Sequence, residues 1–223
     1  MYRYFPNLLT LTRLVLAAVF FVVLNQYRYA TNTPEWILLL AAGVFILAAV
    51  TDWLDGYLAR RWSVESTFGR IMDPFCDKVL VIGAFIYLAG SRFVMPEAVE
   101  HGHWATMVTG VYPWMVAIIL ARELLVTGVR DELEGRGVQF AASMSGKLKM
   151  VLQSIAIPTV LVIVYLDPQR EGGAWLGVVR DVMVYATVLV TLISGLPYII
   201  RAVRAVRDEV PTVAAGDAES WKR

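Results

Sequence analysis

The sequence predicts an all-α integral membrane protein, a bundle of six transmembrane helices. Hydrophobic residues make up 58% of its 223 residues, and the mean hydropathy is +0.60. A soluble domain keeps more polar residues for its surface. Six apolar stretches approach the roughly 20 residues that a helix needs to cross a bilayer. Helices are expected because a backbone in lipid must satisfy its own hydrogen bonds.

The apolar stretches and the helix breakers between them place the six spans. We expect spans at 8–27, 35–53, 74–94, 111–130, 147–166 and 177–201. Pro34, Pro96, Pro168 and the pair Gly172-Gly173 punctuate the connections, where helices must end. The polar segment Asp55–Asp73 joins the second span to the third, and Arg130–Gly146 joins the fourth to the fifth. Residues 1–207 form one membrane domain, and residues 208–223 form a polar tail that we expect to be disordered.

Positive charge is distributed unevenly between the two sides of this topology. Of the 20 Lys and Arg residues, all fall on one side except Arg28, Arg92, Arg170 and Arg180. The positive-inside rule then places both termini and both long polar connections in the cytoplasm. We expect a multi-pass protein of a bacterial inner membrane, in contact with membrane lipids.

Other residue patterns exclude some classes of function. Cys76 is the single cysteine, so the chain has no intramolecular disulfide and no zinc site of the cysteine type. His101 and His103 fall in a loop on the side opposite the aspartates, where a solvated loop explains them. No basic patch indicates a nucleic-acid partner.

Four aspartates within one 26-residue stretch are the main functional signal. In helices, Asp52 and Asp55 share one face, and so do Asp73 and Asp77. Clustered carboxylates at a membrane edge repel one another and need cations to compensate them. Because only oxygen ligands are present, the cluster suits Mg²⁺ or Mn²⁺, as a pair of ions.

Small and basic residues beside the aspartates indicate a phosphate ligand. Gly56 and Ala59 let a ligand approach the backbone, and the Arg60 guanidinium can hold a phosphate in a fork. This arrangement predicts that the ligand is a diphosphate held by the metal ions. The alternative is structural: Asp73 before Pro74 is also a good helix N-cap, and Asp52 and Asp55 can be solvated at the interface.

The fixed gaps of this stretch resemble the motif of the CDP-alcohol phosphatidyltransferase family. The matching residues are Asp52, Asp55, Gly56, Ala59, Arg60, Gly69, Asp73 and Asp77. The resemblance implies the six-helix fold of that family, a homodimer, and displacement of CMP from a CDP-linked lipid by an alcohol. It implies four aspartate metal ligands, with Asp77 also the catalytic base. It implies CDP-diacylglycerol contacts by Asn7, Thr10, Arg13, Gly56, Ala59, Arg60, Ser66 and Gly69.

The second polar connection bears on the acceptor alcohol. Residues 121–130 and 146–153 resemble family members that use glycerol 3-phosphate. We therefore expect Arg122, Arg130 and Lys147 to bind the acceptor phosphate. The alternative role for these cations, and for Lys149, is to anchor the protein at the lipid headgroups. Glu123 either orients an arginine or completes the metal environment.

Three other functions remain open from the sequence. Another acceptor is possible within the same family: inositol phosphate, serine or phosphatidylglycerol. A membrane prenyltransferase also uses aspartates and Mg²⁺, although its aspartate motifs lie far apart. A divalent-cation carrier would place carboxylates near mid-span on several helices.

Overall fold

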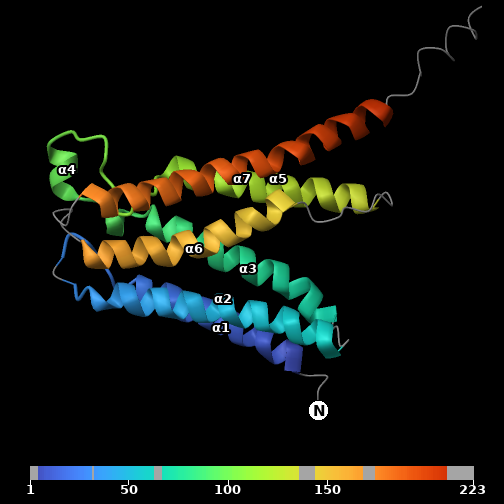
Figure 1. Ribbon diagram of the computed structural model, residues 1–223, viewed down its shortest axis with the longest axis horizontal. Coiled ribbons are helices and arrows are strands. Elements are labelled where there is room, and N and C mark those ends of the chain that lie inside the picture. The colour runs from blue at the N-terminus through green and yellow to red at the C-terminus, as the bar shows by residue number, and fades with distance from the viewer. Residues whose placement is uncertain (1–4, 32, 63–66, 136–143, 168–173, 210–223) are drawn as a thin grey trace, which may run out of the picture.

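The computed structural model describes residues 5–31, 33–62, 67–135, 144–167 and 174–209 (Figure 1). Within these ranges it is all-helical and has no strand, which confirms the predicted class. Six α-helices are long, and each overlaps one of the six predicted spans: α1 (Phe5–Leu24), α2 (Trp36–Trp62), α3 (Thr67–Leu88), α5 (Pro113–Gly135), α6 (Met144–Leu166) and α7 (Ala174–Glu209). The short helices η2 (Ser91–Phe93) and α4 (Pro96–Glu100) lie between α3 and α5.

The helices around the aspartates are longer than expected. α2 continues to Trp62 and α3 begins at Thr67, so both helices extend into the predicted polar connection Asp55–Asp73. Hydropathy ends a span where charged residues begin, but a helix can continue past that point because its backbone bonds do not depend on the side chains. Asp73 therefore lies within α3, and its reading as an N-cap is wrong.

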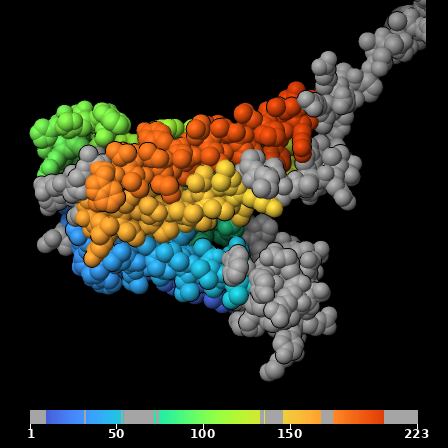
Figure 2. Space-filling view, viewed as in Figure 1, coloured from blue at the N-terminus to red at the C-terminus, as the bar shows by residue number. Residues whose placement is uncertain are grey.

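The long helices run back and forth along one bundle (Figure 1). α1 packs on α2 and α3, α6 on α2 and α7, and α5 on α7. α6 fills the space between α2 and α7 on the face drawn in Figure 2. α1, α3 and α6 begin at the same end at which α2, α5 and α7 finish. We call this the polar end, and the opposite end, which carries α4, the α4 end.

Aromatic packing holds α1 against its neighbours in the core. The ring of Phe20 packs edge-on to Phe45 of α2, with 5.6 Å between centroids. Phe21 stacks on Tyr87 of α3 at 5.4 Å. A Cβ on Gly83 would lie 2.4 Å from the Phe21 ring, so the glycine permits this close approach of α1 and α3.

A buried arginine closes the α4 end. The Arg180 Nη1 donates a hydrogen bond to the carbonyl of Val108 at 2.7 Å, and its Nη2 lies 2.7 Å from Asp181 Oδ1. Thr109 Oγ1 donates to the carbonyl of Leu88 at 2.7 Å. These bonds satisfy backbone groups that leave the helices, and they fasten the loop before α5 to α3 and α7.

The outer surface of the long helices is rich in large apolar side chains, among them Val22, Leu47, Leu124, Val182 and Leu189. Exposure of this extent is unfavourable in water and natural in lipid. Within the described part of the chain, two helices are long and apolar enough to cross a membrane by length and composition, over Gly146–Leu166 and Trp175–Val203. The apolar parts of α1 and α2, Thr10–Leu24 and Trp36–Asp52, are shorter.

Candidate active site

The four predicted aspartates lie on two helices. α2 carries Asp52 and Asp55, and α3 carries Asp73 and Asp77. The side chains of Asp55 and Asp73 lie outside the part of the chain that can be described. Asp77 is close enough to Asp52 for the two carboxylates to interact electrostatically. The structure thus brings together the two described members of the cluster.

α1 brings a buried cation to the same place. Arg13 has only 2% of its side chain exposed, and its Nη1 lies 2.7 Å from Asp52 Oδ1. Thr10, one turn earlier on the same face of α1, is also buried. A buried arginine needs an anion to compensate its charge, and Asp52 supplies it. Arg13, from the segment expected to contact the nucleotide, therefore lies against Asp52, and its contact with the nucleotide stays a prediction.

The other residues expected to bind CDP-diacylglycerol are described less completely. The backbone of Asn7 is helical in α1, that of Gly56, Ala59 and Arg60 is helical in α2, and that of Gly69 is helical in α3. Their side-chain positions, and Ser66 as a whole, lie outside the described residues. Their contacts therefore remain predictions.

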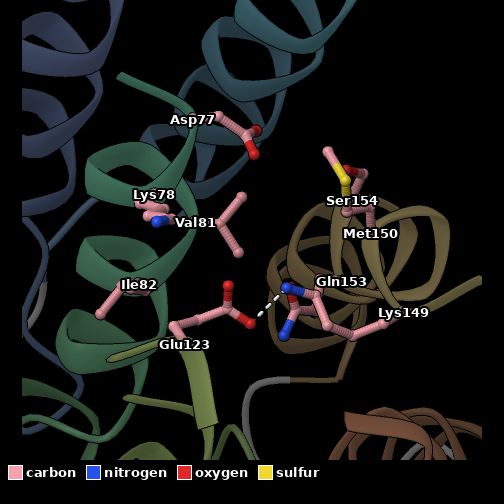
Figure 3. Close-up of a pocket in the computed structure, with 9 residues that line it drawn as sticks. All are labelled: Asp77, Lys78, Val81, Ile82, Glu123, Lys149, Met150, Gln153 and Ser154. Atoms are coloured by element: carbon pink, nitrogen blue, oxygen red, sulfur yellow. Dashed lines mark hydrogen bonds and ion pairs between the residues drawn. The ribbon is translucent and has the colours of Figure 1, made fainter. Parts of the chain in front are cut away.

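A pocket opens beside Asp77 between three helices (Figure 3). The Asp77 carboxylate projects into it from α3, Glu123 from α5, and Lys149 and Gln153 from α6. Its empty space, including the part that is open to solvent, is about 280 Å³. The remaining wall residues are Lys78, Val81, Ile82, Met150 and Ser154. The pocket therefore joins a carboxylate of the aspartate cluster to cationic and amide groups.

Glu123 is the hub of a buried charge network. Its Oε1 accepts a hydrogen bond from Arg122 Nη1 at 2.9 Å and another from Lys149 Nζ, which reaches across from α6. Thr127 Oγ1 donates to the carbonyl of Glu123 at 2.7 Å and accepts a bond from Lys78 Nζ at 2.6 Å. α3, α5 and α6 are thereby linked by charged and polar bonds. Of the two roles left open for Glu123, the network favours orienting cations.

The residues expected to bind the acceptor phosphate do not all lie together. Arg122 adjoins the pocket through Glu123, and Arg130 lies two turns further along α5. Lys147 is exposed and is not part of the pocket wall, whereas Lys149 is buried and is part of it. Residues two apart on a helix face different ways, so only one of these lysines can point inward.

The pocket residues that were not predicted as site residues include three polar residues of α6, Lys149, Gln153 and Ser154. A signal was present for Lys149, because a lysine within an apolar helix is costly unless an anion such as Glu123 compensates it. Gln153 follows it one turn later on the same face of α6. No local pattern distinguishes Ser154 from a solvated or lipid-facing serine.

Comparisons of the sequence with known proteins identify its relatives. A family model described as CDP-alcohol phosphatidyltransferase matches residues 3–193. A Bacillus subtilis (strain 168) protein named CDP-diacylglycerol–glycerol-3-phosphate 3-phosphatidyltransferase is 32% identical over 199 residues, covering 86% of this chain and 92% of the relative. An Escherichia coli (strain K12) protein of the same name is 32% identical over 198 residues, covering 87% and 92%.

A Salmonella typhimurium relative of the same name is 31% identical over 198 residues, which cover 87% of this chain and 92% of the relative. The matched region contains every residue of the aspartate motif and all the described pocket residues. The resemblance inferred from the aspartate motif is therefore confirmed. The chain belongs to the CDP-alcohol phosphatidyltransferase family.

Proposed function

We propose that this protein transfers the phosphatidyl group of CDP-diacylglycerol to sn-glycerol 3-phosphate, releasing CMP and forming phosphatidylglycerophosphate. The names of its relatives support the reaction. The observation that carries the proposal is the pocket, in which the Asp77 carboxylate faces the same space as Lys149. An acceptor with a hydroxyl at one end and a phosphate at the other matches such a pair of groups.

Asp77 is the general base in this proposal. Its carboxylate takes the proton from the 1-hydroxyl of glycerol 3-phosphate. The acceptor oxygen then attacks the lipid-proximal phosphorus, and the bond from that phosphorus to CMP breaks. The described surroundings suit this role, because Asp77 is partly buried and lies at the pocket wall rather than at the open surface.

The donor set of the aspartates fits a hard divalent cation. No three metal-ligating side chains cluster among the described residues, but Asp55 and Asp73 are outside that set. Asp52 and Asp77 supply carboxylate oxygens from two helices, and the one nearby cysteine, Cys76, is buried. Asp52, Asp55, Asp73 and Asp77 would hold Mg²⁺ or Mn²⁺, as two ions. Bound there, the metal would neutralise diphosphate charge and stabilise the leaving group.

Arg122 supports a phosphate site at the far side of Glu123. Its side chain is about nine-tenths buried, with 10% exposed. Its Nη1 and Nη2 have partners, but its buried Nε has no hydrogen-bond partner among the described residues. A buried donor of this kind is costly unless a ligand satisfies it. We assign Arg122, Arg130 and Lys149 to the acceptor phosphate, and Lys147 to the surface nearby.

The membrane arrangement follows from charge and helix length. All six long helices cross the bacterial inner membrane in this proposal, and the polar end faces the cytoplasm. Two copies of the chain form a homodimer, as the family resemblance implies. Protease protection of tags placed after residue 209 and within residues 101–104, in right-side-out vesicles, tests the orientation.

An acceptor assay tests the function. Purified protein in detergent is given CDP-diacylglycerol and Mg²⁺ with glycerol 3-phosphate, serine, inositol phosphate or phosphatidylglycerol, and CMP release is measured. We expect turnover with glycerol 3-phosphate alone, and its loss in EDTA with recovery in Mg²⁺ or Mn²⁺. Equal turnover with an unphosphorylated alcohol would contradict the acceptor assignment, and release of inorganic diphosphate would indicate a prenyltransferase.

A further inference from the structure

α7 carries a buried polar stripe that the proposed reaction does not use. Its members are Thr187, Thr191, Ser194 and Tyr198, with 0%, 0%, 0% and 4% of their surface exposed. Their spacing of four, three and four residues places them on one face of the helix. Polar groups of an apolar helix are buried in this way only when they have partners.

The partners of this stripe include residues of the candidate site. Gln153 of the pocket donates from Nε2 to Thr191 Oγ1 at 3.2 Å. Arg122 Nη2 donates to the backbone carbonyl of Ser194 at 3.4 Å. Arg130 Nη2 donates to the hydroxyl of Tyr198 at 3.2 Å. Three consecutive turns of α7 thus each hold one polar side chain of α5 or α6.

The contact between Arg130 and Tyr198 has two components. Besides the hydrogen bond, the guanidinium carbon lies 5.9 Å from the centroid of the Tyr198 ring. This distance is within the range at which a cation is attracted to an aromatic face. The phenol therefore restrains both the direction and the distance of Arg130 from α7.

A glycine of α7 makes room for Arg122. A Cβ on Gly195 would lie 3.2 Å from Arg122 Cγ and 4.0 Å from its Nε. The first distance is shorter than an ordinary carbon–carbon contact, so any side chain at position 195 would displace the arginine stem. The absence of a side chain lets Arg122 lie flat against α7 and reach Ser194 and Glu123 together.

We propose that Gly195 and Tyr198 of α7 are positioning residues that fix Arg122 and Arg130 for the phosphate of the acceptor. Neither residue touches substrate in this proposal, which rests on the proposed function. Preorganised cations bind a phosphate more tightly than mobile ones, because less side-chain freedom is lost on binding. Both residues lie beyond the region that the family model matches, which ends at residue 193. Their contacts are with Arg122 and Arg130, so we expect them to affect affinity for the acceptor and not the chemistry of the aspartates.

Steady-state kinetics of Tyr198→Phe and Gly195→Ala test the proposal. We expect the KM for glycerol 3-phosphate to rise about 3- to 10-fold in each variant, the size of one ordinary net hydrogen bond, because each arginine is retained and loses only its fixed position. The KM for CDP-diacylglycerol should stay within about twofold. Tyr185→Phe, on an exposed tyrosine of α7, and Gly128→Ala, where an added Cβ meets nothing within 4 Å, are matched controls that should leave both constants unchanged.

A double-mutant cycle separates positioning from a general loss of packing. In an Arg130→Gln background, Tyr198→Phe should change the KM for glycerol 3-phosphate no further, because its target is gone. The proposal would be overturned if Tyr198→Phe raised the KM for glycerol 3-phosphate as much in the Arg130→Gln background as in the wild type. It would also be overturned if the KM values for glycerol 3-phosphate and CDP-diacylglycerol rose together. The two single variants act on different arginines. If one of them fails to fold, the other still tests the proposal.

The activity of the wild-type protein distinguishes the positioning role from the proposed function. Wild-type turnover of glycerol 3-phosphate together with unchanged KM values in both variants overturns the positioning role alone. A wild-type protein that does not use glycerol 3-phosphate overturns the proposed function and the positioning role with it.

Discussion

Arg13 of α1 and Asp52 of α2 form an ion pair, with 2.7 Å between Nη1 and Oδ1, although they are 39 positions apart in the chain. The pair connects the first helix to the aspartate cluster. It places a fixed positive charge beside a carboxylate that we assign to a metal ion. We expect the guanidinium also to hold a phosphate of the donor, so that Arg13 would serve both the carboxylate and the donor substrate.

Arg13→Gln should lower kcat/KM for CDP-diacylglycerol by about 10- to 100-fold, the range expected for hydrogen bonds to charged groups. Arg13→Lys keeps the positive charge but loses the two parallel hydrogen bonds that a guanidinium can donate. Its kcat/KM should therefore lie between that of Arg13→Gln and that of the wild type. Rates of CMP release at varied CDP-diacylglycerol measure the effect. Arg28→Gln, on an exposed arginine far from the aspartates, is the control. Equal rates of CMP release for Arg13→Gln and the wild type would show that Arg13 does not bind the donor.

Asp77→Asn should reduce kcat by about 10²- to 10⁴-fold, the usual contribution of a general base. Binding of CDP-diacylglycerol should persist, and it can be followed as a rise in unfolding temperature when the lipid is added. Asp131→Asn, on an exposed carboxylate of α5, should leave kcat unchanged. Retained turnover in Asp77→Asn would mean that another group takes the proton.

Glu123→Gln should both destabilise the protein and weaken acceptor binding. The change leaves Arg122 and Lys149 buried without the carboxylate charge that they share, and breaking a buried ion pair costs about 3–5 kcal/mol. Thermal unfolding in detergent and the KM for glycerol 3-phosphate report the two effects. Glu97→Gln, on an exposed residue of α4, should change stability by less than about 0.5 kcal/mol. An unaltered unfolding temperature and KM would show that the network has no energetic role.

Two glycines at the α4 end allow a matched test of backbone and packing costs. Gly102 and Gly110 have φ of 65° and 70°, a conformation that costs other residues about 1–2 kcal/mol. A Cβ on Gly102 meets nothing within 4 Å, whereas one on Gly110 would lie 2.7 Å from Asp181 Oδ1. Gly110→Ala should therefore lower the free energy of unfolding more than Gly102→Ala, by about 1–3 kcal/mol. Similar losses of unfolding free energy in both variants would mean that the Arg180–Asp181 pair moves aside at no cost.

The sequence predicted the helices and the aspartate cluster because these features are local. Apolar length marks each long helix, and Asp52, Asp55, Asp73 and Asp77 are separated by three or four residues within two helices. Hydropathy did not predict that α2 and α3 continue toward each other. A window average falls at the first charges, while the helical hydrogen bonds continue through Trp62.

The acceptor side could not be predicted in full because it depends on how helices are rotated against one another. The choice between Lys147 and Lys149 depends on which face of α6 meets Glu123 of α5. The contact of Arg130 with Tyr198 joins residues 68 positions apart. No periodicity within one segment encodes such a pairing, although the polar stripe of α7 was visible as a repeat of Thr, Thr, Ser and Tyr at helical spacing.

The position of α7 in the chain has a consequence for biogenesis. The ribosome makes α7 after every other described helix, yet Arg122 and Arg130 each donate a hydrogen bond to it. A chain whose last helix has not yet entered the bilayer can already contain all four aspartates without a formed acceptor site. The acceptor side of the pocket would then be completed only when α7 packs against α5.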